Sequence, residues 1–487
     1  RFYISHGAAC KLTVRKALRM ANSSTERAVQ WALSHSAGLT YPGGSLASLS
    51  CTPPNDYLQL ESYLYEQSVR LNVPVHELTP ALLASVNTSI GCPSALLDPL
   101  TCCALVACAA KRLREKVEAG LFSSEVTNKN IVHTGPHHDD VELSYHGGMH
   151  VMMGRTGVYN NSTTVSLSDT FDGNNSQMTT LPAVPAPAAT HALGEQVGGN
   201  NNHFAYLTSG FHSVNESFLQ QQCEAVMRTV TTATGVECTF LEAAVRAGEI
   251  DRDYDDLMGA FHNAFFAKDC TTMDYIEQVI FLRRCAEVWN IATTLPYAEL
   301  VATLREKVDW LLGDYLPNHK PGDNIPKDIQ ILKGCMRESE TDRVWALSRM
   351  PMNRVHHLRS KFYTDDFFTP MPSLEDDAQP MANLLKARQP SVLTVALDPE
   401  GTGPDTHYKV LLVVAAGLRL VLSRNELTDP NPLVWGYRNV WFEFEPSDTT
   451  LMIPVSAPDL EFTHDMFMAC FTTQKAASFP SPYHDGP

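Results

Sequence analysis

Apolar side chains recur at helical spacing through the first quarter of the chain. Val14–Leu33 and Tyr57–Leu71 carry them three or four positions apart, and Ala104–Leu121 begins apolar and becomes amphipathic. A loop rich in proline and glycine, Thr40–Asn55, divides these segments. Because this spacing gathers apolar residues on one face of a helix, we predict a helical extension over residues 1–125.

The pattern changes after residue 125, where short apolar runs end in polar loops. Asn130–His133, His203–Leu207 and Ser391–Ala396 are runs of this kind, and the last is largely apolar. Such a strand suits a parallel sheet that is covered on both faces. We therefore predict a Rossmann-like, three-layer α/β domain with a mostly parallel sheet over residues 126–480.

Two segments interrupt this domain. Residues 155–202 are rich first in asparagine, serine and threonine, then in proline and alanine, then in glycine and asparagine, which predicts a low-complexity surface insertion. Residues 216–328 predict a helical insertion, with long segments at Phe218–Thr232, Cys238–Ala247, Asp255–Phe266 and Met273–Thr293.

Four later segments complete the predicted domain. Lys333–Arg349 and Tyr408–Ser423 have the pattern of helices. Val434–Phe444, which is rich in aromatic residues, and Thr450–Val455 have the pattern of strands.

Acidic residues outnumber basic ones, with 54 aspartates and glutamates against 37 lysines and arginines and a formal net charge of −17. An acidic chain has no general attraction to phosphate backbones, so we expect no nucleic-acid partner. The twelve cysteines include no Cys-x-x-Cys pair, and several lie in apolar runs such as Cys102–Cys108. This usage predicts free thiols in a reducing compartment, the cytoplasm.

The sequence predicts no membrane span. The apolar stretch Val410–Leu422 is interrupted by Arg419 and is shorter than the roughly 20 residues that a spanning helix needs. The chain begins at Arg1 and not at a methionine. We therefore expect a missing upstream segment, and import into an organelle stays open.

The densest group of reactive side chains, Pro136–Asp140, directly follows the first predicted strand. It holds two histidines and two aspartates, which can supply metal ligands and one free base. His407 follows another predicted strand, so one sheet edge could bring His137, Asp140 and His407 together. The alternative is an ordinary polar loop or a helix cap.

Pro136–Asp140 resembles the Pro-His-Pro-Asp-Asp signature of the LmbE/PIG-L family of zinc-dependent N-deacetylases. The resemblance is closest to the LmbE-like domain fused to the C-terminus of some glucosamine-6-phosphate deaminases. Further segments resemble the family's later motifs in the same order: Ala205–Gly210, Leu332–Glu340, Asp398–Glu400 with Thr406-His407, Trp435–Trp441 and Met452–Ser456.

The resemblance implies a Zn²⁺ ion held by His137, Asp140 and His407, with Asp139 as the general base. Glu400 stands at the apparent position of the general acid, since the family's histidine three residues before the last ligand is absent. His138 also replaces the motif's middle proline.

Two arginines are candidate substrate ligands. Arg337 could bind or position substrate together with Glu340, or the two could be a solvated charge pair on a helix. Arg438 could contact a phosphate or carboxylate, or pack through its stem.

Three functions remain open from the sequence. The resemblance favours a hydrolase that removes an acetyl group from an amino sugar or its phosphate. A degenerate subunit of a larger protein assembly is the second. The third is part of a glucosamine-6-phosphate deaminase/isomerase whose catalytic half lies upstream, because Glu26–Leu33 resembles the tail of such a domain.

Overall fold

The computed structural model describes residues 55–86, 92–122, 128–149, 200–234, 241, 252–291, 295–320, 322–366, 368–398, 405–438, 444–453, 455 and 457–475. The predicted helix Val14–Leu33, nearly all of the 155–202 and Cys238–Ala247 segments, and Glu400 lie outside these residues.

The described strands are β1 (Asn130–Gly135), β2 (Asn201–Tyr206), β3 (Val355–His357), β4 (Val392–Ala396) and β5 (Leu433–Tyr437). The described α-helices are α3 (Asn55–Leu71), α4 (Pro80–Ser85), α5 (Pro99–Phe122), α6 (Asp140–Tyr145), α8 (Glu216–Thr232), α10 (Arg252–Phe266), α11 (Cys270–Val288), α12 (Tyr297–Trp310), α13 (Leu316–Asn318), α14 (Lys327–Leu347), α15 (Gln379–Arg388), α16 (Asp405–Ser423) and α17 (Ala457–Cys470).

The five strands form one sheet in the order β3-β2-β1-β4-β5, and every pairing is parallel. This confirms the predicted α/β class and the parallel sheet. From β1 the chain builds outward to β2 and β3 on one side, and then returns to place β4 and β5 on the other. The carboxyl ends of β1 and β4 therefore flank the point where the strand order reverses, which is where open α/β sheets form their binding crevice.

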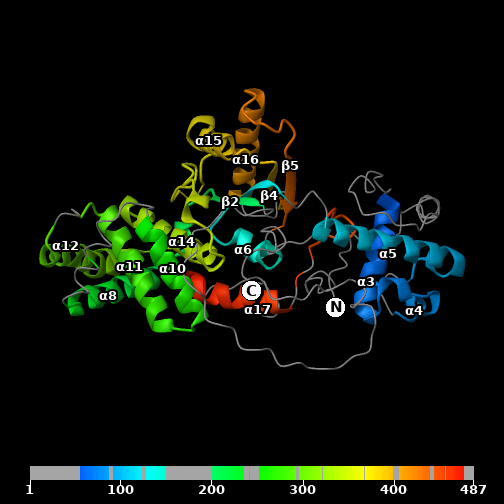
Figure 1. The fold of residues 1–487 in the computed structure, drawn as a ribbon, viewed down its shortest axis with the longest axis horizontal. Helices are drawn as coiled ribbons and strands as arrows, with labels where there is room; N and C mark the ends of the chain where they lie inside the picture. The colour runs from blue at the N-terminus through cyan, green and yellow to red at the C-terminus, as the bar shows by residue number, and fades with distance from the viewer. Residues whose placement is uncertain are drawn as a thin grey trace.

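Side chains that alternate along the strands pack into two separate cores, one on each face of the sheet. Val132, Ala205 and Leu393 lie in one core with α15 and α16. Phe204 and Tyr206 face the opposite way, into a core with α6, α14 and α17. Two helical layers thus cover the sheet, as the predicted three-layer fold requires (Figure 1).

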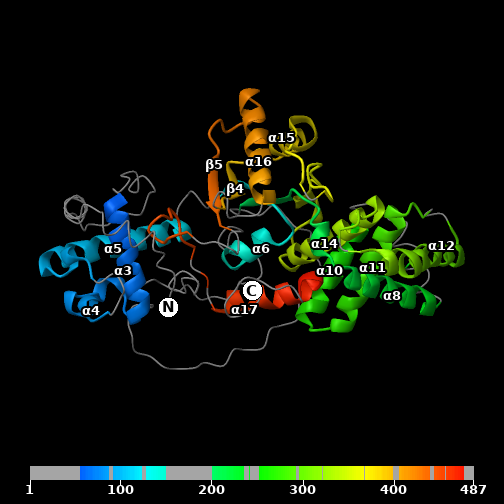
Figure 2. The same ribbon diagram turned by 180° about the vertical axis from the view of Figure 1, so that it is seen from behind.

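A group of helices, α8, α11 and α12, lies beside the sheet domain in both views (Figures 1 and 2). Its core contains Leu219, Val279 and Leu304, and the first half of α14 contributes Ile329 and Leu332 to the same core. The helical character predicted for residues 216–328 is therefore present in the described part of that segment, which is joined to the sheet domain through α14.

Helices α3 to α5 lie on the other side of the sheet domain and have a core of their own (Figure 1). They contact the chain segment after β5. The buried amine of Lys116 donates to the carbonyls of Pro446 and Ser447 at 2.6 and 3.1 Å. The amide of Met452 donates to the carbonyl of Lys116 at 3.1 Å.

The structure corrects two of the predicted strands and adds one. The described residues of Thr450–Val455 form no strand, because Met452 pairs with the end of α5 and not with a sheet neighbour. β2 begins at Asn201, inside the segment predicted as an insertion, since the buried Asn202 bonds to His133 at 3.0 Å. β3, at Val355–His357, was not predicted.

One described helix, α16, is long and apolar enough to cross a membrane by length and composition. One such helix is weak evidence, since the core helices of soluble proteins pass the same test. Val410, Val413, Val414 and Val421 of α16 are buried in the core that it shares with α15 and the sheet.

Candidate metal centre

The loop after β1 carries the candidate ligands and is fixed to the neighbouring strand. Both the amide and the hydroxyl of Thr208, just beyond β2, donate to the carbonyl of Pro136, at 3.1 and 2.8 Å. Asp139 occupies the position before α6, and its carbonyl accepts from the amide of Leu143 at 2.8 Å. The loop therefore presents its side chains from a rigid strand end.

His137, Asp140 and His407 converge at this edge of the sheet. His137 Nδ1 and His407 Nε2 lie 3.2 Å apart, and each lies 3.4–3.5 Å from Asp140 Oδ2. One ligand atom from each residue lies within 4.8 Å of the others, as atoms that share one metal ion must. Two imidazole nitrogens and one carboxylate oxygen are a common donor set for catalytic zinc.

A second carboxylate holds His407 in place. Asp398, just after β4, lies 2.6 Å from His407 Nδ1. Since a carboxylate only accepts, Nδ1 carries the proton and Nε2 directs its lone pair toward His137 and Asp140. Burial alone would lower the pKa of His407, but the carboxylates of Asp140 and Asp398 outweigh it and raise that pKa.

Asp139 is held by Arg337 from α14, whose guanidinium donates to the Asp139 carboxylate at 2.8 Å. Arg337 also pairs with Glu340 and donates to the Thr473 hydroxyl at 3.0 Å. Arg337 and Glu340 are each 1% exposed, so they are not a solvated surface pair. Arg337 thus positions the aspartate that the sequence predicts as a general base.

The two neighbouring aspartates have pKa values that move in opposite directions. Burial raises the pKa of Asp139 despite the charge of Arg337, and the charge of Asp140 adds to the rise. Burial would also raise the pKa of Asp140, but the charge of His407 and hydrogen bonds from His137 lower it to about 2. Asp140 is therefore a permanent anion suited to ligation, whereas Asp139 can exchange a proton.

Two predicted site residues remain, Glu400 and Arg438. Glu400 falls outside the described residues. Arg438 follows β5, where its guanidinium donates to the carbonyl of Leu397 and lies 4.5 Å from the ring centre of Phe444. Arg438 thus lies next to the strand end that carries Asp398.

The sequence prediction did not include Asp398 or Thr473 among the site residues. Asp398 had a usable signal, because it is the first acidic residue after a buried strand and so lies at the same sheet edge as His137. The sequence carries no such signal for Thr473, because only the packing of the C-terminal residues against α14 brings Thr473 to Arg337.

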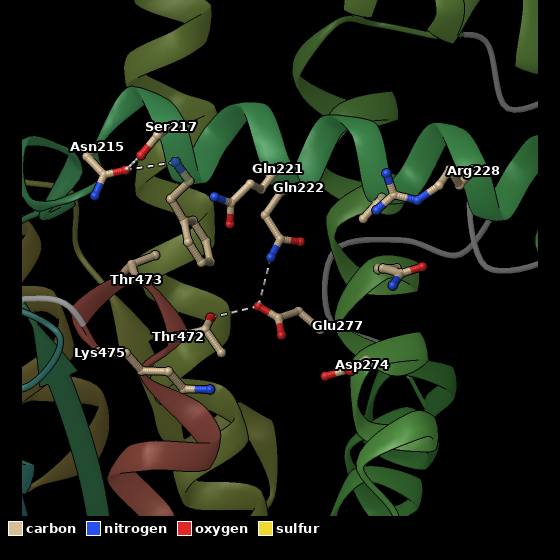
Figure 3. A pocket seen from close by; sticks show the side chains of 13 residues that line it. Asn215, Ser217, Gln221, Gln222, Arg228, Asp274, Glu277, Thr472, Thr473 and Lys475 are labelled. Carbon is tan, nitrogen blue, oxygen red and sulfur yellow. Dashed lines mark hydrogen bonds between the residues drawn. The ribbon is translucent and has the colours of Figure 1, made fainter.

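A separate pocket of about 550 Å³ lies between α8, α11 and residues 472–475 (Figure 3). Its lining is mainly polar. The hydroxyl of Thr472 donates to Glu277 at 2.7 Å, and Gln222 lies 3.5 Å from the same carboxylate. The pocket contains none of the three candidate ligands, but Thr473 belongs both to its wall and to the Arg337 network.

Comparison with known proteins gives one weak similarity. No protein-family model matches the chain, and no solved structure is significantly similar to it. The chain is 25% identical over 202 residues to a protein of Bacteroides thetaiotaomicron described as glucosamine-6-phosphate deaminase-like. That match spans 41% of this chain and 29% of the relative, so it covers less than a third of the relative's length.

Proposed function

We propose that this chain is a zinc-dependent hydrolase of the LmbE/PIG-L type that removes the acetyl group from an amino sugar or an amino-sugar phosphate. The observation that carries the proposal is the meeting of His137, Asp140 and His407 at the strand-order reversal, with Asp139 beside them.

The residues fit a mononuclear zinc ion. Three protein ligands of the N,N,O type are the usual number at a catalytic zinc, where the remaining position serves water or substrate. A bound zinc ion would supply Lewis acidity toward the acetyl carbonyl and would make a water molecule acidic enough to attack it. His137 is the most accessible ligand, with 24% of its side chain exposed against 5% for Asp140 and 3% for His407.

Asp139 is the proposed proton acceptor. Asp139 lies next to the ligand Asp140 in the chain, and Arg337 keeps its carboxylate in one orientation for taking a proton from the attacking water. Water adds to the acetyl carbon, the C–N bond breaks, and acetate and a free amine leave. Glu400 is the proposed donor of the proton that the departing amine needs.

The substrate class rests on two weaker supports. The relative's description names an amino-sugar phosphate, and the motif resemblance points to N-acetylated sugars. We propose that Arg438, at the same edge of the sheet, binds a phosphate or carboxylate of the substrate. The nine cysteines of the described part are free thiols, which agrees with the proposed cytoplasmic location.

The test is metal analysis combined with acetate release from N-acetylglucosamine and its 6-phosphate. Asp139→Asn should keep its zinc and lose about 10²–10⁴-fold in kcat, the usual contribution of a general base. Asp256→Asn, an exposed aspartate on α10, is the matched control and should match the wild type. A protein without stoichiometric zinc, or an Asp139→Asn variant with normal kcat, would contradict the proposal.

The alternative of a degenerate subunit is favoured by the absence of the family's general-acid histidine three residues before His407. A protein that binds zinc stoichiometrically but releases no acetate would support this alternative. For the deaminase alternative, the protein should be incubated with glucosamine 6-phosphate and assayed for ammonia, which a deaminase releases from the free amine and a deacetylase does not.

A further inference from the structure

His138, the second histidine of the loop, turns away from the first cluster into the protein interior. It is 0% exposed, and its ring stacks on Tyr206 with the ring centres 5.2 Å apart. Its Nε2 lies 3.0 Å from Nδ1 of His357, the last residue of β3. This spacing is close to the 3.2 Å between His137 and His407 in the first cluster.

A buried carboxylate completes this second group. Glu338, on α14, is 1% exposed, and one of its oxygens lies within 4.8 Å of the ligand nitrogens of both His138 and His357. The three residues come from three elements that are distant in sequence: the loop after β1, α14 and β3. A hydrogen bond between the imidazoles would account for the contact between the two rings, and Arg359 pairs with Glu338, but what brings all three donor groups together is their shared position.

We propose that His138, Glu338 and His357 form a second metal site, which takes a divalent transition-metal ion such as Zn²⁺ and has a structural role. Two imidazoles and one carboxylate suit ions of this class. The site is additional to the cluster of His137, Asp140 and His407, and it does not depend on the proposed deacetylase activity.

The orientation of His357 supports ligation. Asp342 accepts from His357 Nε2 at 3.1 Å, so the His357 Nδ1 lone pair faces His138. Tyr254 in turn donates to the other oxygen of Asp342 at 2.7 Å. The pair Asp342–His357 therefore repeats the arrangement of Asp398–His407. In both pairs a buried carboxylate holds one nitrogen of the histidine ring and leaves the other nitrogen available for a metal ion.

Arg359 leaves Glu338 able to bind a metal. Its guanidinium donates to Glu338 Oε1 at 2.6 Å and to Oε2 at 2.8 Å, one bond to each oxygen. An ionised carboxylate accepts about four hydrogen bonds, so each oxygen keeps a free lone pair. Arg359 is 42% exposed, and it covers Glu338 toward solvent.

Burial indicates a structural role and not a catalytic one. The His357 side chain is 8% exposed, and His138 and Glu338 are fully or almost fully buried, so substrate has no access to this cluster. A catalytic site must keep a position that substrate can reach, and this buried cluster has none. A metal here would join the β1 loop to α14, which carries Arg337, and would thereby keep Arg337 against Asp139.

The test is the metal stoichiometry of the full chain, measured by elemental analysis after loading with Zn²⁺. The wild type should hold two equivalents, and His357→Ala should hold one. His356→Ala is the matched control. It lies next to His357 on β3 but pairs with His203 at 3.3 Å, so this variant should keep both equivalents. Equal metal content in the wild type and in His357→Ala overturns the proposal.

Further measurements test the second site even if His357→Ala fails to fold. Glu338→Gln keeps the shape of the side chain and should lose one equivalent with an unchanged circular dichroism spectrum. Titration of Co²⁺ into metal-free protein should show two steps in visible absorption for the wild type and one for Glu338→Gln, and identical titrations overturn the second site. His407→Ala should keep the metal at the second site, so failure of either cluster is distinguished from failure of the other.

Discussion

His137 and His138 are neighbours in one loop, yet they belong to opposite kinds of environment. His137 is partly exposed and faces His407 beyond the strand-order reversal, whereas His138 is fully enclosed between β2, β3 and α14. Each faces a histidine whose second nitrogen is held by a carboxylate, Asp398 in one case and Asp342 in the other. The difference lies in access to solvent, not in the type of donor atom.

The ligand types alone do not separate the catalytic role that we propose for the first cluster from the structural role that we propose for the second. Both clusters contain two histidines and one carboxylate. The first has Asp139 beside it, an acid whose raised pKa suits proton transfer. The second has Arg359 on its outer side, which stabilises a charge but transfers no proton at neutral pH.

The largest expected effect comes from removing a ligand of the first cluster. His407→Ala should lower kcat/KM for acetate release by about 10³-fold or more, because it removes both the metal and the polarisation of the carbonyl. His357→Ala should reduce activity far less, since it acts only through the position of Arg337. Steady-state kinetics on the two variants measures this. Equal losses would mean that the two clusters do not differ in role.

A smaller effect is expected from the two supporting carboxylates. Asp398→Asn should weaken metal binding at the first cluster by about 10–100-fold, and Asp342→Asn should do the same at the second. Competition with a coloured chelator gives both affinities. Each variant should leave the other cluster's affinity unchanged. If one variant weakened both sites equally, the clusters would be a single coupled unit.

The smallest expected effect is on the pH dependence of stability in the metal-free protein. The raised pKa of His407 means that its stabilising contribution is complete below about pH 6.5 and is lost as pH rises through the folded-state pKa. Burial lowers the pKa of His138 well below its usual value, so His138 favours the folded state above about pH 6.5 and costs stability as pH falls.

Urea unfolding of the metal-free protein between about pH 5 and 8 separates these contributions. His407→Gln should remove the loss of stability at rising pH, and His138→Asn should remove the loss at falling pH. The same sign of change in both variants would contradict the opposite environments of the two histidines.

Much of the sheet was predictable from the sequence because apolar runs such as Ser391–Ala396 form its buried central strands. β3 was not predictable in this way, since its three residues include only one apolar side chain, Val355, and the two histidines resemble a surface segment. Thr450–Val455 has strand character but contacts the end of α5, and local pattern carries no information about such a partner.

Likewise, only part of the candidate site could be predicted from the sequence. His137, Asp139 and Asp140 follow one strand directly, so their proximity could be predicted from the sequence. His407 could be placed with them only from parallel strand ends and motif resemblance. The grouping of His138 with Glu338 and His357 could not be predicted, because it depends on how α14 packs beside β3.

Helix α14 has 21 residues, which is a rod of roughly 30 Å, and its two ends belong to different cores. Ile329 and Leu332 pack with the neighbouring helices, and Val344 and Trp345 pack under the sheet. Arg337 and Glu338 lie between these anchors. Loosening the helical group would therefore free the middle of the rod, so a partner that binds to those outer helices could change the reactivity of Asp139 without approaching the metal.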